Sequence, residues 1–450
     1  MNASLHFATA LLPDGWARDV RITVKDGLMA AIEADVAPGE SERHAVALPG
    51  LPNLHSHAFQ RGMAGLAEVR GHSDDSFWTW REIMYRFVDR LTPDDLAAIA
   101  AQAYAEMLES GFTRVGEFHY LHHGSDGAPF ADPAEMSGAI VMAAEEVGIA
   151  LTHLPVFYAH SGFGGSAPGE GQRRFLHDID GFATLLDAAR AKAKALPDAM
   201  VGIAPHSLRA VTPAELAALA PLADGAPIHI HIAEQVREVE DCLAWSGARP
   251  VEWLLDHAPV GPQWCLVHAT HMTDAETVAM ARSGAVAGLC PITEANLGDG
   301  LFPAEAFLTA GGAYGVGSDS NVRIDATEEL RLLEYGQRLA RRGRNLLTGP
   351  GASTGGALYR AALAGGAQAL GAEAGLRVGA PADIVSLDVE HPSLAARSGD
   401  ALLDGLIFAA GREGVDRVWR RGREVVTNGR HIARGAIAAR YRATLTKLLA

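Results

Sequence analysis

The chain has 450 residues, of which 48% are hydrophobic and 20% are charged, a composition typical of a folded globular protein and not of a disordered one. Its formal net charge is -16 and it has no run of lysine and arginine, which argues against binding to nucleic acid or to an anionic membrane surface. An anionic ligand would therefore need a locally basic pocket. The length fits one large barrel with a smaller accessory module.

Cysteine usage points to a reducing compartment. Cys242, Cys265 and Cys290 are odd in number and form no CxxC spacing, so neither a disulfide framework nor a thiolate zinc site is expected. The first twenty residues lack the basic and sustained apolar segments of a signal peptide, and no stretch is long and apolar enough to span a bilayer. We therefore expect a cytoplasmic location and no membrane partner.

Similar short β-type runs occur at both ends of the chain. Residues 1–48 alternate such runs with turn residues, and the pattern returns at 382–390 and 416–426, followed by an Asn428-Gly429 turn. Because strands from the two ends can complete one sheet, we expect a small β-sandwich domain built from both termini. The expected division is residues 1–48 and 376–450 for this domain, the latter with a terminal helix, and 49–375 for a catalytic barrel between them.

The middle of the chain alternates short apolar runs with helical stretches rich in alanine and leucine, which is the pattern of βα units. Such repetition predicts an α/β fold, a (β/α)₈ barrel with its chemistry at the C-terminal strand ends. Two long connections, 59–92 and 161–171, are either lids or mobile surface segments. The eight expected strands begin near residues 50, 112, 149, 201, 227, 264, 285 and 313.

The first expected strand ends in His55-Ser56-His57. Residues i and i+2 of a strand share a face, so both imidazoles can bind one ion. An HxH pair by itself is a weak signal, because two such histidines are often incidental.

Three further expected strands end in residues that fit the same ion site. The fifth ends at His231 with Glu234 three residues later, which would supply a third nitrogen and a general acid/base. The sixth ends at His268 and the eighth at Asp319. Each alone could be a packed histidine or an Asx turn, but barrel strand ends converge on one axis, so together they predict a metal site. His229, deeper on the fifth strand, is expected to be a packed or supporting histidine.

These residues, in this order and spacing, resemble the amidohydrolase superfamily along essentially the whole chain. The resemblance implies a TIM barrel with a single divalent ion, usually zinc, and a water molecule flanked by Glu234 and His268. Binuclear members carry a carboxylated lysine on the fourth strand, whereas VGIAPHSLRAV has none, which indicates the mononuclear deaminase branch. The metal ligands that the resemblance implies are His55, His57, His231 and Asp319.

This residue set suits the hydrolysis of a C=N bond. Zinc lowers the pKa of a water molecule toward neutrality, so that the water can attack the electrophilic carbon. Glu234 is placed to carry protons to the nitrogen that leaves as ammonia, and Asp319 can take the proton from the water. The charge of Asp319 also favours a cationic amidinium substrate, and His268 would orient the water or polarise the tetrahedral centre.

Polar residues just past the strand ends indicate what the pocket binds. Arginine holds carboxylates in a bidentate manner, so two arginines in an acidic protein predict a substrate with carboxylate groups. For Arg81, which lies in WREIMYRF, an ordinary surface position is the alternative. The pocket candidates are Gln60, Arg81, Tyr120, His206 and Arg209.

A closer resemblance narrows the substrate. The strings LPNLHSHAFQRGMAGLAE, WREIMYRF, GEFHYLHH, APHSLRAV and HIHIAEQ are similar to the formimidoylglutamate deiminases of histidine degradation. This implies hydrolysis of N-formimino-L-glutamate to N-formyl-L-glutamate and ammonia, and it implies a homodimer. It also implies that the five pocket candidates contact the glutamate part of the substrate.

Two alternatives remain open from the sequence. Another mononuclear deaminase, acting on guanine or an adenosine-type base, would use the same metal core with aromatic stacking from Phe77, Trp78 and Trp80, although two arginines fit an uncharged base poorly. A catalytically silent binding protein on this scaffold is the other, and it is disfavoured because every expected metal ligand is retained.

Overall fold

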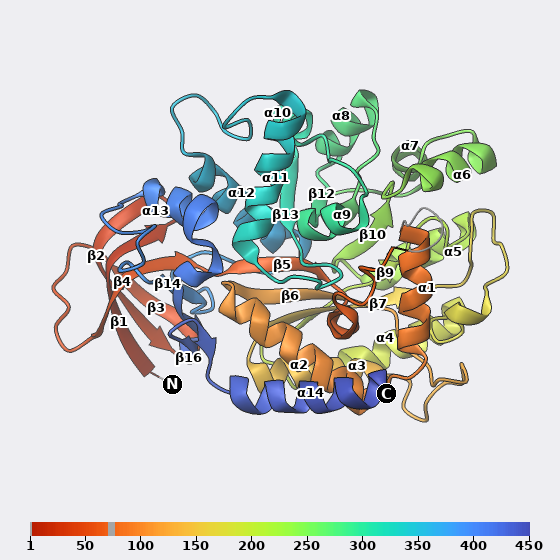
Figure 1. Ribbon diagram of the computed structural model, residues 1–450, viewed down its shortest axis with the longest axis horizontal. Coiled ribbons are helices and arrows are strands. Elements are labelled where there is room, and N and C mark those ends of the chain that lie inside the picture. Colours follow the sequence, from red (N-terminus) through yellow and green to blue (C-terminus); the bar gives the residue numbers. More distant parts are fainter. Residues whose placement is uncertain (1, 71–76) are drawn as a thin grey trace.

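The computed structural model describes residues 2–70 and 77–450, so part of the expected 59–92 connection, residues 71–76, lies outside the described residues. The chain forms a β-sheet domain beside a barrel ringed by helices (Figure 1). The two parts are continuous at the start of the barrel, because the last strand of the N-terminal segment, β4 (Glu42–Pro49), is followed directly by β5 (Leu51–Ser56).

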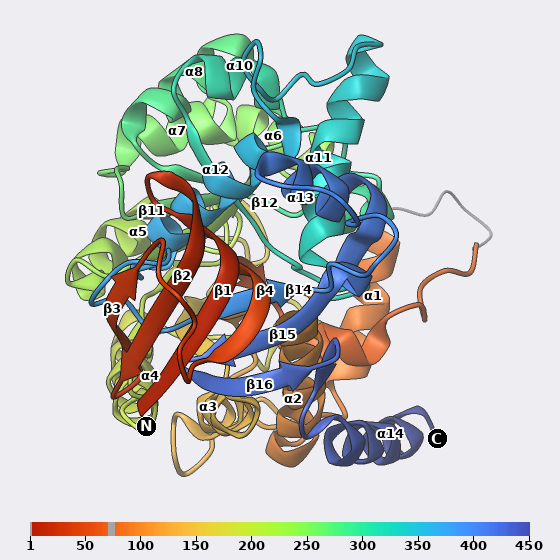
Figure 2. The ribbon, with the colours of Figure 1, turned by 90° about the vertical axis from the view of Figure 1, so that its left-hand side faces the viewer.

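The β domain is one eight-stranded sheet made from both ends of the chain, as Figure 2 shows face-on. Its order is β17-β16-β15-β14-β4-β1-β2-β3, and the junction of the two ends is the antiparallel pair β14–β4. Alternating inward residues fill its own core, with Phe7 and Ile22 packed near Trp419. Its other strands are β1 (Asn2–Leu12), β2 (Gly15–Lys25), β3 (Leu28–Glu33), β14 (Ile384–Leu387), β15 (Val415–Arg420), β16 (Arg423–Thr427) and β17 (Arg430–His431).

The expected strand at 416–426 is a hairpin of two strands. Arg421 and Gly422 both have positive φ, 48° and 73°, so the chain reverses there between β15 and β16. Two consecutive residues with positive φ suit the tight turn of a hairpin, and the apolar pattern on either side does not reveal the turn.

The barrel strands coincide with the eight predicted runs. Two parallel ladders, β5-β6-β7-β8 and β10-β11-β12-β13, make up most of it. Parallel bridges join them at both seams: Ser56 pairs with Asp319, and Ser207 pairs with His231. The bounds not yet given are β6 (Phe112–His119), β7 (Ala150–Phe157), β8 (Met200–Val201), β9 (Ala204–Pro205), β10 (Ile228–Ile232), β11 (Trp264–His268), β12 (Val286–Leu289) and β13 (Ala313–Val316).

The fourth barrel strand is interrupted, which the sequence did not indicate. It consists of β8 and β9 with Gly202 and Ile203 between them. A Cβ atom on Gly202 would lie 2.4 Å from the carbonyl oxygen of Pro227, so the backbone of the next strand approaches here more closely than a side chain allows. The strand therefore continues past this point only because the residue is glycine.

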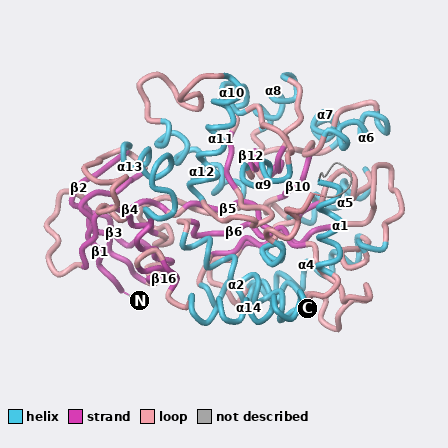
Figure 3. The backbone as a smooth tube through the Cα atoms, viewed as in Figure 1, coloured by secondary structure: helices cyan, strands magenta, loops and turns pink. Residues whose placement is uncertain are grey.

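Helices cover the outside of the barrel and alternate with its strands (Figure 3). Several begin with capping boxes; for example, Thr92 accepts from the backbone N–H of Asp95 at the start of α2. The helices are α1 (Phe77–Val88), α2 (Pro93–Glu109), α3 (Glu135–Val147), α4 (Ile179–Ala193), α5 (Pro213–Leu219), α6 (Val236–Ser246), α7 (Pro250–His257), α8 (Asp274–Ser283), α9 (Pro291–Leu297), α10 (Ala304–Thr309), α11 (Ala326–Arg341), α12 (Thr354–Ala369), α13 (Asp400–Gly405) and α14 (Arg434–Leu449).

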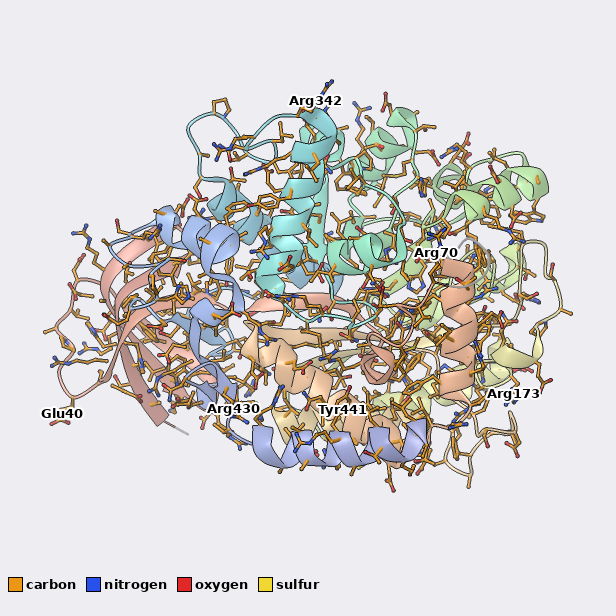
Figure 4. The ribbon with its side chains drawn as sticks, in the orientation of Figure 1. Glu40, Arg70, Arg173, Arg342, Arg430 and Tyr441 are labelled. Carbon is orange, nitrogen blue, oxygen red and sulfur yellow. The ribbon has the colours of Figure 1, made fainter. Side chains whose placement is uncertain are left out.

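The terminal helix α14 lies along α2 on the barrel (Figure 1). Tyr441, labelled in Figure 4, donates a hydrogen bond to the carbonyl oxygen of Arg61 at 3.0 Å, and Lys447 pairs with Asp95 at 2.6 Å. Among the described residues, no helix combines the length and the apolar character that a membrane crossing requires.

Candidate active site

The end of β5 supplies the first two donors of the predicted metal site. His55 and His57 point to the same side of the strand, with their Nε2 atoms 3.2 Å apart. Both rings are buried, His55 completely. Burial lowers the pKa of His55 to about 3, so its ring is neutral and has a lone pair to donate.

His231 and Asp319 complete the group from the other side of the barrel. Nε2 of His231 lies 3.0 Å from Nε2 of His55, and Oδ1 of Asp319 lies 3.2 Å from Nε2 of His57. One donor atom from each of the four residues falls within 4.8 Å of the other three. The four predicted ligands are thus brought together from strands one, five and eight.

The second ring nitrogens of two histidines hold the donors in orientation. Nδ1 of His57 lies 2.9 Å from the carbonyl oxygen of Phe118, and Nδ1 of His231 lies 3.1 Å from that of His206. A carbonyl oxygen can only accept, so both Nδ1 atoms carry a proton, which leaves Nε2 as the nitrogen through which each ring can bind a metal ion. Lone pairs that converge at this separation fit a cation between them.

The fourth donor is a carboxylate that stays ionised. Burial by itself would raise the pKa of Asp319, but the surrounding imidazole groups of His55, His57 and His268 outweigh burial and hold the pKa well below its usual range. Its φ of 44° turns the chain at the strand end, and the Asn321 side chain donates to the Asp319 carbonyl oxygen at 3.1 Å. The set of three neutral imidazoles and one carboxylate is a donor set typical of a divalent ion such as zinc.

Glu234 and His268 lie beside this group. Oε1 of Glu234 and Oδ2 of Asp319 each lie 3.8 Å from Nε2 of His268, and all three side chains are buried. Burial raises the pKa of Glu234 to about 7, which suits a group that must take and give a proton near neutrality. On the opposite edge of the ring, Nδ1 of His268 contacts Oε1 of Glu294 at 3.2 Å.

A pocket opens over these residues. Every predicted site residue lines it except His55, which lies behind the others. Helix α1, which stands beyond the C-terminal ends of β5 and β6 in Figure 1, forms one wall of the pocket. Three of the four predicted metal donors, His57, His231 and Asp319, therefore lie in the lining of one pocket.

Three of the predicted pocket residues are polar neighbours of the metal group. The Gln60 amide donates to the hydroxyl oxygen of Tyr120 at 2.8 Å, and its own Oε1 has no partner among the described residues. His206 packs on the other side of Tyr120, with ring centroids 5.8 Å apart. Burial lowers the pKa of His206 well below its usual value, so this ring is neutral.

The two predicted arginines converge on one aromatic ring. The Arg81 guanidinium lies 4.6 Å and the Arg209 guanidinium 5.7 Å from the centre of the Trp78 indole. Nε of each arginine is buried without a hydrogen-bond partner among the described residues. Arg209 is buried and Arg81 half-buried, and both line the same pocket, so their positive charge is available to an anionic ligand.

The sequence is similar to known families and proteins. It matches the family described as "Amidohydrolase family" over residues 46–425 and "Formimidoylglutamate deiminase HutF, N-terminal domain" over residues 3–45. A protein of Pseudomonas aeruginosa named formimidoylglutamate deiminase is 54% identical over 98% of both chains. The chain belongs to the amidohydrolase family.

Solved structures agree with this assignment. An amidohydrolase from Brucella melitensis is 56% identical and superposes with a TM-score of 0.97 over the whole of both chains. A zinc-bound adenosine deaminase from Xanthomonas campestris, at 23% identity, has a TM-score of 0.82 over 99% of this chain and 98% of that one. The second likeness concerns the fold alone.

The pocket of this amidohydrolase also contains residues that the sequence analysis did not single out. Met84 and Tyr85 follow Arg81 by three and four residues on α1, so the helical repeat of WREIMYRF could have indicated them. Tyr158 comes directly after β7, as Tyr120 comes directly after β6, and the same strand-end rule would have found it. No sequence signal marked the remaining lining residues, which are Phe175, Thr293, Leu297 and Ser320.

Proposed function

We infer that this amidohydrolase hydrolyses N-formimino-L-glutamate. Water adds to the C=N carbon of the formimino group, the C–N bond to the terminal nitrogen breaks, and N-formyl-L-glutamate and ammonia are released. The observation that carries this inference is the pair Arg81 and Arg209, whose Nε atoms are buried and have no hydrogen-bond partner among the described residues, in the same pocket as most of the four-donor metal group. The identity of 54% to a named formimidoylglutamate deiminase supports it.

We propose that the metal is one zinc ion held by the three histidines and Asp319. The donor set supports this choice, since three neutral imidazoles with one carboxylate suit zinc. The fourth barrel strand, in VGIAPHSLRAV, offers no lysine to bridge a second ion of the kind found in binuclear relatives. When bound, the ion activates a water molecule and polarises the substrate.

The side chains around the ion divide the proton transfers between them. Asp319 stays ionised and can accept a proton from the attacking water, while its charge favours the amidinium form of the substrate. Glu234, whose raised pKa of about 7 lets it exist in both forms, delivers protons to the departing nitrogen so that it leaves as ammonia. His268, held by Glu294, orients the water.

The proposed role of the other pocket residues is to bind the glutamate part of the substrate. Arg81 and Arg209 bind its carboxylates, and the stack on Trp78 supports both guanidinium groups. Gln60, Tyr120 and His206, which line the same pocket, contribute hydrogen bonds.

A guanine or adenosine-type deaminase is the competing function. Phe77 and Trp80 line the pocket and could stack on a base. An uncharged base would form no charge-assisted hydrogen bond with either guanidinium group, whereas a dicarboxylate can form one with each.

Two further properties belong to the proposal. The family resemblance supports a homodimer, which light scattering would detect as twice the mass of one chain.

Three free, buried cysteines support a cytoplasmic location, where thiols stay reduced.

The test is ammonia release from N-formimino-L-glutamate, N-formimino-L-aspartate, guanine and adenosine, each incubated with protein of measured metal content. We expect rapid release only from the first. Release from a base at a comparable rate would replace this function with the competing one, and no release from any compound despite a full metal site would favour a binding protein.

A further inference from the structure

A second group of potential metal donors adjoins the first. Donor atoms of His268, Cys290 and Asp319, all buried, lie within 4.8 Å of one another. These residues come from the ends of strands six, seven and eight, whereas the first group uses strands one, five and eight. Asp319 alone is common to both groups.

The two oxygens of Asp319 face different groups. Oδ1 lies 3.4 Å from Nε2 of His55 and 3.2 Å from Nε2 of His57, whereas Oδ2 lies 3.8 Å from Nε2 of His268. A carboxylate turned in this way can bind one cation with each oxygen. An ion bound by the first group through Oδ1 therefore leaves Oδ2 of Asp319 free to bind an ion in the second group.

Glu294 holds the two other members of the group in place. Its Oε1 accepts from the backbone N–H of Cys290 at 2.9 Å and contacts Nδ1 of His268 at 3.2 Å. When Nδ1 of His268 donates to this carboxylate, Nε2 is the nitrogen left to bind a cation, which is the usual arrangement of a histidine ligand. The Glu294 backbone N–H also donates to the Cys290 carbonyl oxygen at 2.9 Å. The turn that carries the thiol is thus fixed at both ends.

We propose that His268, Cys290 and Asp319 form a second, inhibitory site for a thiophilic divalent cation such as cadmium or excess zinc. The soft sulfur donor beside an imidazole and a carboxylate selects such ions over calcium or magnesium. The bound ion replaces the thiol proton of Cys290, which is released to solvent. His268 and Asp319 line the pocket and Cys290 lies behind them, so the ion enters through the pocket.

Occupation of this site stops turnover because it removes the lone pair of His268 and the second oxygen of Asp319 from the reaction. Inhibition rests on the function proposed above for these two residues. Binding does not, since it depends only on the three donors.

Cadmium titration of the zinc-loaded protein tests binding without any substrate. A cadmium–thiolate bond gives a charge-transfer absorption in the ultraviolet, and the first group, with three histidines and an aspartate, contains no sulfur. We expect this absorption to saturate at one cadmium per chain, with the zinc content of the same samples unchanged. Deiminase activity should fall in proportion to the absorption.

Two serine variants locate the site. Cys290→Ser should keep the basal activity and lose the absorption. It should also need at least ~10-fold more cadmium for half inhibition, because removing a ligand lowers metal affinity at least as much as removing a residue that supports a ligand. Cys242→Ser is the matched control: its thiol is equally buried but lies on α6, 3.8 Å from the Ser246 hydroxyl, and this variant should behave as the parent.

The absorption of the parent protein tests the site even if one variant does not fold. Absence of the absorption in the parent protein, or its persistence in Cys290→Ser, would overturn the site. Glu294→Gln gives an independent check, since weakening its hold on His268 and Cys290 should reduce cadmium affinity by ~10- to 100-fold while the sulfur stays in place. Absorption without inhibition would keep the site and count against the proposed catalytic roles instead.

Discussion

The backbone N–H of Asp319 donates a hydrogen bond to the carbonyl oxygen of His55 at 2.9 Å, and the carboxylate of Asp319 lies 3.4 Å from Nε2 of the same histidine. The first contact joins the eighth barrel strand to the first. The second joins two donors of the metal group. The same pair of residues therefore takes part in closing the barrel and in the proposed metal site.

Removing a donor should remove the metal. We expect purified protein to hold about one tightly bound divalent ion per chain, and His231→Ala or Asp319→Asn to lose it, because each change leaves three of four ligands. Metal analysis after dialysis measures this. Two tightly held ions per active chain would contradict the single-ion proposal.

Glu234→Gln should separate metal binding from turnover. The amide keeps the size of the side chain but cannot carry a proton, so turnover should fall by at least ~10²-fold while the metal content stays that of the parent. Steady-state ammonia release and metal analysis on one preparation provide both numbers. Turnover near that of the parent would show that another group moves the proton.

Loss of either pocket arginine should weaken substrate binding alone. Arg81→Met or Arg209→Met removes a charge-assisted contact and should cost ~2 to 4 kcal/mol in transition-state binding, or roughly 30- to 1000-fold in kcat/KM, with zinc content unchanged. The parent should already be poor with N-formimino-L-aspartate, whose carboxylates are one methylene closer together. If both variants match the parent on N-formimino-L-glutamate, the substrate assignment loses its chemical basis.

A glycine at the barrel seam should not tolerate a side chain. Gly317, just past β13, lies so close to β5 that an added Cβ would be 2.8 Å from both the nitrogen and the oxygen of His55. Gly317→Ala should therefore destabilise the protein by about 1 to 3 kcal/mol and weaken metal retention, because the clash displaces a ligand. At Gly261, no atom lies within 4 Å of an added Cβ, so Gly261→Ala should change stability by less than about 0.5 kcal/mol in the same urea titration.

Buried neutral histidines should make the fold sensitive to acid. Burial lowers the pKa of His153 to about 3, against an ordinary value near 6.5, so between these values the unfolded chain binds a proton that the folded one does not. The stability contribution of this neutral ring is complete above pH ~6.5 and is lost as pH falls toward 3, at about 1.4 kcal/mol per unit. In urea unfolding between pH 6 and 4.5, His153→Leu should lose stability less steeply than the parent by about that slope. Equal slopes would mean that His153 is not the responsible group.

The sequence by itself determined the barrel, and it predicted a four-donor metal site and the pocket residues just past the strand ends. These signals are local: an apolar run followed by a polar residue has the same form in every βα unit, and a barrel brings all such ends to one axis. His55, His57, His231 and Asp319 could therefore be identified without knowing any distance between them.

Only the tertiary structure decided which side chains share a partner. Three features depend on contacts between different segments of the chain. They are the contact of Arg81 and Arg209 with the ring of Trp78, the position of the Glu294 carboxylate between His268 and Cys290, and the interruption of the fourth strand at Gly202. Cys290 in particular has no sequence partner at metal-ligand spacing. It becomes a potential ligand because neighbouring strands of a closed barrel place His268 and Asp319 beside it, a consequence of packing that no local pattern encodes.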